Sequence, residues 1–242
     1  MEYVEVARAA SERGEVVLRE RRPAAPDQGD ESDQGDESGG SGPAGVLELR
    51  VNGVFVMDTR ETGSEELLAT RALALVEEPR DVLVGGLGLG FTAHAVLADP
   101  RVERLVVVEI EDALVGWMRD GTVPHGPGFL ADGRLQVVTA DVRQAVAEAA
   151  PESLDLVLLD VDNGPAFLVY DDNAAVYEAP FLAAVGSRLR PGGAVVVWSA
   201  APAPELAAAM ERVLDGVSAV PVDVRLQERD ERYWLYLGRR RA

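Results

Sequence analysis

A run of glycines near the middle of the chain, Gly85-Gly86-Leu87-Gly88-Leu89-Gly90, can bring backbone N–H groups close to a ligand. Glycine permits this approach because it has no Cβ and reaches positive φ without strain. The pattern is G-x-G-x-G and not the G-x-G-x-x-G fingerprint, which argues against a nicotinamide-dependent oxidoreductase. Such a turn also occurs where it only allows a helix to pack on a strand. The residues that follow the turn must therefore show whether it binds a ligand.

Two carboxylates follow at the ends of the next two expected strands. Glu109 comes 19 residues after Gly90, a place where an acidic side chain accepts hydrogen bonds from ribose hydroxyls. Asp141 ends the next strand and can accept from an adenine amino group, while the Val142 N–H donates to the ring. A surface carboxylate is the simpler interpretation of Glu109, but the glycine turn upstream favours ribose. We therefore expect a nucleoside site that contains Gly86, Gly88, Gly90, Glu109, Ile110, Asp141 and Val142.

Two further carboxylates, Asp160 and Asp162, follow the fourth expected strand and precede a Gly164-Pro165 turn. A carboxylate beside the nucleoside can hold an amine, take its proton or stabilise positive charge. Asp162 and Asn163 are also residue types that commonly occupy turns. We expect Asp160 and Asp162 to be catalytic, Asp160 also to contact the nucleoside, and no metal to be bound.

The composition excludes several other chemistries. The 242 residues include no Cys, and all 23 basic residues are Arg, which excludes thiol nucleophiles, Schiff-base lysines and the P-loop lysine. The formal net charge of −19 disfavours binding to nucleic acid. No apolar run is long enough to span a membrane, and the first 20 residues lack an apolar signal core. We expect a cytoplasmic protein whose partner is a small-molecule acceptor.

The elements that position these residues alternate between strands and helices from Asp81 onward. The expected strands of this part are Asp81–Gly85, Arg104–Ile110, Leu135–Ala140, Leu154–Asp160 and Ala194–Ser199. The expected helices are Thr92–Ala98, Ala113–Asp120, Val142–Ala149, Ala174–Leu189 and Glu205–Leu214. Continuous apolar strands indicate a parallel sheet covered on both faces, and Val217–Leu226 with Arg232–Leu237 should add an antiparallel pair. The pattern predicts a doubly wound α/β fold.

The N-terminal part is expected to be a small β-hairpin subdomain. Its expected strands are Glu15–Glu20, Val46–Val51 and Val54–Met57, with an Asn52-Gly53 hairpin turn. Asp27–Ser38 reads DQGDES twice and offers no apolar side chain, so we predict a disordered acidic insertion over about 23–44. Ser64 is the expected N-cap of a helix that runs to about Glu77, and the domains are predicted as 1–63 and 64–242.

Several segments together resemble one family. VLVGGLGLG, LVVVEIE, VVTADV, LDLVLLDVDNGPA and LRPGGAVVVWS are similar to the spermidine synthase (polyamine aminopropyltransferase) family, within the class I S-adenosylmethionine-dependent methyltransferase superfamily. The resemblance includes the hairpin piece VNGVFVMDTRE and covers most of the chain outside the acidic insertion. It implies a Rossmann-like methyltransferase sheet, the nucleoside roles given above, and Asp160 as the counterpart of the family's catalytic aspartate. It also implies a homodimer, and S-adenosylmethionine or its decarboxylated form as the bound nucleoside.

Three places depart from the family's pattern. Gly88 stands where the family has an Asp that grips the aminopropyl amine of decarboxylated S-adenosylmethionine. The family's second Asp in the loop after strand four is Asn163 or is displaced to Asp162, and its Tyr-Gln pair is replaced by Gly63-Ser64-Glu65-Glu66. We therefore expect methyl transfer from S-adenosylmethionine to a small acceptor. The alternatives are aminopropyl transfer to a polyamine, which is spermidine synthase activity, and a non-catalytic nucleoside-binding homologue.

Overall fold

The computed structural model describes residues 2–22, 45–161, 163–226 and 229–241. The predicted acidic insertion over about 23–44 therefore lies outside the described residues. Backbone contacts divide the chain into two units, Met1–Arg60 and Glu61–Ala242. The division falls three residues before the predicted boundary between residues 63 and 64.

The first unit contains a four-stranded antiparallel sheet in the order β1-β2-β3-β4. Its strands are β1 Glu2–Ser11, β2 Gly14–Arg22, β3 Val46–Val51 and β4 Val54–Asp58. The predicted hairpin between β3 and β4 is present, with φ of 50° at Asn52 and 77° at Gly53, as a two-residue turn between strands requires. The sequence did not indicate β1, because its side chains are mostly exposed and show no strict alternation.

The second unit contains a seven-stranded sheet in the order β10-β11-β9-β8-β5-β6-β7. Its strands are β5 Asp81–Gly85, β6 Arg104–Glu109, β7 Leu135–Thr139, β8 Leu154–Leu159, β9 Leu189–Ser199, β10 Leu214–Leu226 and β11 Arg229–Arg240. The strands β5 to β9 are parallel, and the pair β10 and β11 joins β9 in antiparallel fashion. The prediction of a doubly wound α/β sheet with an antiparallel edge is confirmed.

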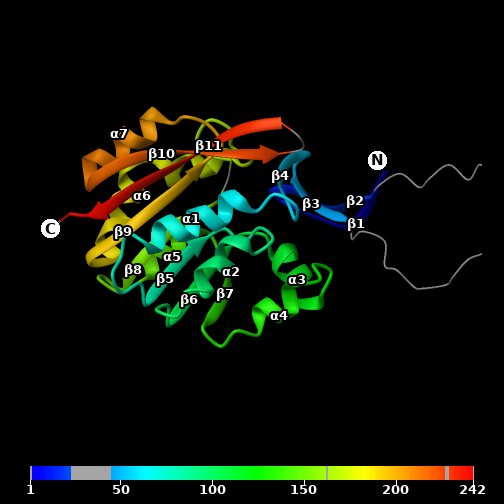
Figure 1. Cartoon of the computed structure of the whole chain (residues 1–242), viewed down its shortest axis with the longest axis horizontal. Helices are drawn as coiled ribbons and strands as arrows, with labels where there is room; N and C mark the ends of the chain where they lie inside the picture. Colours follow the sequence, from blue (N-terminus) through cyan, green and yellow to red (C-terminus); the bar gives the residue numbers. More distant parts are fainter. Residues whose placement is uncertain (1, 23–44, 162, 227–228, 242) are drawn as a thin grey trace, which may run out of the picture. The chain divides into compact units, whose positions relative to one another are not determined.

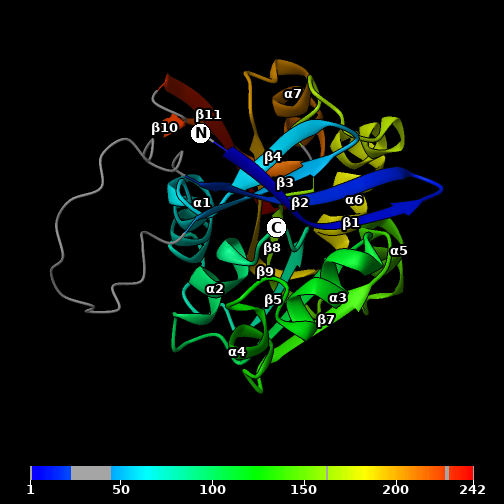
Figure 2. The same cartoon turned by 90° about the vertical axis from the view of Figure 1, so that its right-hand side faces the viewer.

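Helices cover both faces of this sheet (Figure 1). They are α1 Gly63–Leu73, α2 Phe91–Leu97, α3 Asp112–Asp120, α4 Gly126–Leu130, α5 Val142–Glu148, α6 Ala179–Arg188 and α7 Pro204–Val213, with a 3₁₀ helix over Asp171–Tyr177. Figure 2 shows α1 and α2 on one side of the strands and α5 and α6 on the other. The apolar side chains of α5, α6 and α7 form one cluster with alternate residues of β8 and β9. No helix in the described ranges is long and apolar enough to cross a membrane.

The strand order reverses beside β5, since the chain continues to β6 on one side and later returns to β8 on the other. Open α/β sheets form a ligand-binding crevice at this reversal, outside the carboxyl ends of the strands. The glycine turn follows β5, Glu109 ends β6, and Asp160 follows β8. The fold therefore brings these three parts of the sequence to one edge.

Candidate active site

The glycine turn is held tightly between the ends of β6 and β8. The N–H of Gly86 donates to the carbonyl of Val108, with a distance of 2.8 Å between nitrogen and oxygen. A Cβ on Gly86 would lie only 2.0 Å from the carbonyl oxygen of Asp160, and the φ of Gly86 is +95°. Gly88 and Gly90 also have positive φ, at 51° and 88°. The turn therefore needs glycine for close packing and for its backbone conformation.

Glu109 connects the glycine turn to the end of β6. Its side chain is 7% exposed, and its two carboxylate oxygens accept from the N–H of Leu87 at 2.9 Å and of Glu111 at 2.8 Å. Burial raises the pKa of Glu109, while these backbone hydrogen bonds oppose the rise. Each carboxylate oxygen has two lone pairs, so hydrogen bonds from ribose hydroxyls remain compatible with this arrangement. The ribose role of Glu109 stays a prediction, as does contact with the neighbouring Ile110.

Asp141 was predicted to end the third strand, but β7 ends at Thr139 and Asp141 is the N-cap of α5, where an arginine shares its carboxylate. The side chain accepts from the backbone N–H of Arg143 at 2.7 Å and thereby caps the helix. The guanidinium of Arg143 also contacts both carboxylate oxygens, the shortest distance being 2.6 Å. Val142 is buried beside Gly85, since a Cβ on Gly85 would approach its Cγ2 to 2.8 Å. The adenine roles of Asp141 and Val142 stay predictions.

Asp160 directly follows β8 and lies beside the glycine turn. Its N–H donates to the carbonyl of Gly85 at 2.8 Å, and its Oδ2 accepts from the hydroxyl of Thr92, on the first turn of α2, at 2.8 Å. Burial raises the pKa of Asp160 to about 6, and the hydrogen bond from Thr92 opposes part of this rise. The second predicted catalytic carboxylate, Asp162, lies outside the described residues.

Glu65 is a carboxylate of this site that the sequence analysis did not assign. Burial raises its pKa to about 7, and the next largest cause of the rise is the negative charge of Asp160. A hydrogen bond from the hydroxyl of Ser64 to Glu65 Oε2, at 2.6 Å, opposes the rise. A signal was present in the sequence, because Glu65 belongs to the segment noted for lacking the family's Tyr-Gln pair. The replacement removes that pair but introduces a carboxylate within electrostatic reach of Asp160.

The predicted start and end of this first helix were wrong. Ser64 is a buried residue inside α1, and Thr62 occupies the cap position without a side-chain capping bond. The helix ends at Leu73 and not near Glu77. The hydroxyl of Ser64 is therefore available to Glu65, because it is not used in capping.

A family model described as a spermine/spermidine synthase domain matches residues 61–223. The chain belongs to this family. The match begins with the second unit and includes Glu65, the glycine turn, Glu109, Asp141 and Asp160.

Relatives of this spermine/spermidine synthase family member are named for two different activities, aminopropyl transfer and N-methylation. The chain is 37% identical over 144 residues to polyamine aminopropyltransferase 2 of Pseudomonas aeruginosa. The aligned region covers 58% of this chain and 39% of that protein. It is 33% identical over 132 residues to putrescine N-methyltransferase 2 of Nicotiana tabacum, covering 54% of this chain and 35% of that protein. The matched part of the chain thus spans well under half the length of these relatives.

The fold is also similar to a solved structure. The crystal structure of a spermidine synthase in complex with the transition-state analogue AdoDATO superposes with a TM-score of 0.74 at 15% identity. The superposition covers 97% of this chain and 73% of that chain. This likeness confirms the predicted fold class.

In this family member, the segment between β8 and α6, which contains Tyr170 and Asp172, contacts other elements at the carboxyl edge of the sheet. The hydroxyl of Tyr170 donates to Glu111 Oε1 at 3.0 Å, which connects the segment to the end of β6. A guanidinium N–H of Arg143 donates to the carbonyl of Asp172 at 3.4 Å, which connects the segment to α5. Both contacts lie next to predicted nucleoside residues, Ile110 and Asp141.

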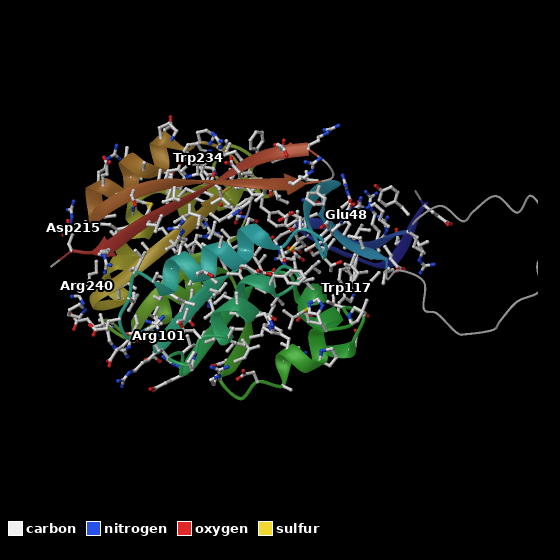
Figure 3. The ribbon with its side chains drawn as sticks, in the orientation of Figure 1. Glu48, Arg101, Trp117, Asp215, Trp234 and Arg240 are labelled. Carbon is white, nitrogen blue, oxygen red and sulfur yellow. The ribbon has the colours of Figure 1, made fainter. Side chains whose placement is uncertain are left out.

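The two edges of the sheet differ in charge. At the amino edge, Arg190 contacts both Asp81 and Asp155 at the starts of β5 and β8. Arg101 and Arg240, labelled in Figure 3, donate to backbone carbonyls near this edge, Arg240 to Leu189 at the start of β9. At the carboxyl edge, no ion pair within the described ranges joins an arginine to Glu65, Glu109 or Asp160. At the carboxyl edge Arg143 pairs with Asp141, so Glu65, Glu109 and Asp160 are the carboxylates of this edge without an arginine partner in the described residues.

Proposed function

We propose that this chain transfers an alkyl group from an adenosyl sulfonium nucleoside to an amine nitrogen of a diamine or polyamine. We further propose that the group is aminopropyl and that the donor is decarboxylated S-adenosylmethionine. The observation that carries the proposal is Asp160, which lies beside the glycine turn at the carboxyl edge and acts electrostatically on a second carboxylate, Glu65. The names of the relatives, a polyamine aminopropyltransferase and a putrescine N-methyltransferase, support an amine as the acceptor.

The residues of the site fit an adenosyl nucleoside. Gly86 packs against the carbonyl of Asp160 with no room for a side chain, which fixes the glycine turn at the carboxyl edge where such turns bind nucleosides. Glu109 is a buried carboxylate with lone pairs still available for the ribose hydroxyls. The sulfonium supplies the reactivity, since its carbon–sulfur bond breaks on attack. The protein holds the amine in line and stabilises its positive charge through Asp160.

The charge of the site favours the decarboxylated donor. The two charged groups that act on Glu65 are Asp160 and Glu61, and both are carboxylates. A donor tail that carries its own carboxylate would be repelled there, and the repulsion is strong because a partly buried site screens charge poorly. A tail that ends in an ammonium group alone would be attracted.

Methyl transfer from S-adenosylmethionine to an amine is the second candidate. Gly88 favours it, because this position offers no carboxylate to an aminopropyl amine. The relative named putrescine N-methyltransferase also favours it. In this reaction, Asp160 would have the same role of orienting the amine.

Calorimetric titration with both nucleosides distinguishes the two donors. We expect the decarboxylated nucleoside to bind at least about tenfold more tightly than S-adenosylmethionine, a difference of about 1.4 kcal/mol. Methylthioadenosine, which lacks the charged tail, is the control that reports the nucleoside part alone. Tighter binding of S-adenosylmethionine would reverse the choice of donor, and no binding of any adenosyl nucleoside would contradict the proposed function.

A further inference from the structure

The proposed reaction requires an amine with a free lone pair, and aliphatic amines are mostly protonated near neutral pH. A group in the site must therefore remove a proton before the nitrogen can attack. Asp160 and Glu65 are the candidates for this group, because both carboxylates have a pKa raised toward neutral pH.

The two carboxylates come from neighbouring elements. The helices α1 and α2 pack side by side, and α1 also contacts β8 (Figure 1). Glu65 and Thr92 are on the first turns of these helices, and Thr92 binds Asp160 at the end of β8. Each carboxylate has one oxygen fixed by a hydroxyl, from Ser64 or from Thr92. Oδ1 of Asp160 has no hydrogen-bond partner among the described residues.

The surroundings of Glu65 raise its pKa and so favour its acting as a base. Arginines hold the pKa of other carboxylates below the usual value, as Arg101 does for Asp99 and Arg134 for Asp132. The charged groups that act on Glu65 are instead Asp160, which follows β8, and Glu61, which precedes α1. Burial is the largest cause of its raised pKa, and both of these charges raise it further, so that Glu65 can accept a proton near neutral pH.

A separate observation also indicates a ligand beside these carboxylates. Leu159 pairs with Val197 in the parallel strands β8 and β9, so Asp160 and Trp198 come next to each other one residue later. Leu159 and Val197 point into the cluster under α5 to α7, and side chains alternate along a strand. Trp198 and Asp160 therefore share the face covered by α1 and α2.

Trp198 is 9% exposed, and its Nε1 has no hydrogen-bond partner among the described residues. The N–H of a buried tryptophan usually has a partner. A bound ligand with an acceptor atom beside Asp160 would supply one. Trp198 therefore brings a buried N–H without a protein partner in the described residues to the sheet face that also carries Asp160.

We propose that Glu65 is the base that removes the proton from the acceptor amine, while Asp160 orients the nitrogen. This inference rests on the proposed function. The carboxylate of Glu65 takes one proton from the ammonium group and becomes a carboxylic acid. The freed lone pair forms a bond to the carbon next to the sulfonium, and the carbon–sulfur bond breaks with its electrons going to sulfur. The products are a neutral thioether and an alkylated ammonium.

Glu65→Gln tests the proposal, with Glu66→Gln as the matched control. Glu66 is in the same helical turn but is exposed, and its side chain accepts a hydrogen bond from Thr62 on the same helix end. In the unmodified protein we expect kcat/KM to rise with pH through about 7, because Glu65 must be ionised to accept a proton. In Glu65→Gln we expect the plateau to fall by roughly a hundredfold. The rise through about pH 7 should also be lost, because the group that causes it is no longer present.

The controls separate this role from a structural one. Glu66→Gln should keep both the plateau and the midpoint, and Glu65→Asp should restore part of the lost rate. Glu65→Gln should bind methylthioadenosine like the unmodified protein, because Glu65 acts on the amine. An unchanged pH profile in Glu65→Gln would overturn the proposal while leaving alkyl transfer established.

A second measurement does not depend on alkyl transfer. In protein with ¹³C-labelled glutamate, the carboxyl resonance absent from Glu65→Gln belongs to Glu65. We expect it to titrate near pH 7 and to shift when putrescine is added to protein loaded with methylthioadenosine. A resonance that putrescine does not move would overturn the proposal. A shift without any alkyl transfer would support Glu65 as an amine ligand and contradict the proposed function.

Discussion

Replacing Asp160 by Asn is expected to lower kcat/KM for alkyl transfer by a factor of roughly 10² to 10⁴. Asparagine keeps the shape of the side chain and can still accept from the hydroxyl of Thr92, so the fold and the glycine turn should remain. It loses the negative charge that holds the amine in line with the sulfonium. The measurement is steady-state kinetics with the donor and a diamine, together with calorimetric titration of methylthioadenosine, whose binding should change little.

Asp155→Asn is the matched control, because Asp155 lies near the start of β8, at the opposite edge of the sheet from Asp160. It is 8% exposed and binds Arg190 and the N–H of Asp81. Its replacement should lower the free energy of unfolding by about 1–3 kcal/mol and leave kcat/KM close to that of the unmodified protein. A rate in Asp160→Asn equal to that in Asp155→Asn would refute the role given to Asp160.

Gly86→Ala is expected to weaken nucleoside binding strongly and to destabilise the second unit. The new Cβ would lie 2.0 Å from the carbonyl oxygen of Asp160, which is backbone and cannot move aside as a flexible side chain can. The φ of +95° at Gly86 adds strain of about 1–2 kcal/mol for any residue with a Cβ. We expect a total loss of about 3 kcal/mol or more in the free energy of unfolding and at least about a hundredfold weaker binding of methylthioadenosine. Denaturant unfolding and calorimetry at low temperature measure both.

Gly192→Ala separates the clash from the backbone strain. Gly192 has a similar φ of +84°, but a Cβ there would meet no atom within 4 Å. It should therefore cost only about 1–2 kcal/mol and leave nucleoside binding unchanged. Equal effects of the two substitutions on binding would contradict the close approach at Gly86 as the reason for the glycine.

The sheet of the second unit was predictable because its strands have a strong local signal. The apolar runs of β6 and β8 are largely buried, which is typical of strands in a parallel sheet covered on both faces. The glycine turn, Glu109 and Asp160 could be placed at one edge because the carboxyl ends of parallel strands meet there. The grouping of these residues at one edge was thus inferred from the strand order, and their nucleoside roles stay predictions.

Contacts between elements were not predictable in the same way. Nothing in the local sequence indicates that Arg143 shares the carboxylate of Asp141, or that α1 brings Glu65 within reach of Asp160. Those contacts depend on packing between segments that are far apart in the sequence. The replacement of the family's Tyr-Gln pair was therefore interpreted as a loss of amine anchors, which favoured methyl transfer. The structure and the relatives support aminopropyl transfer at least as well.

Product analysis by mass spectrometry tests the central claim most directly. The protein is incubated with decarboxylated S-adenosylmethionine and putrescine, and in a parallel reaction with S-adenosylmethionine and putrescine. We predict methylthioadenosine and an aminopropylated diamine in the first reaction and no alkylated diamine in the second, with both products of the first lost in Asp160→Asn. Methylated putrescine in the second reaction alone would contradict the proposed donor. Absence of any alkylated amine with putrescine and with longer polyamines would contradict amine alkylation as the function of this chain.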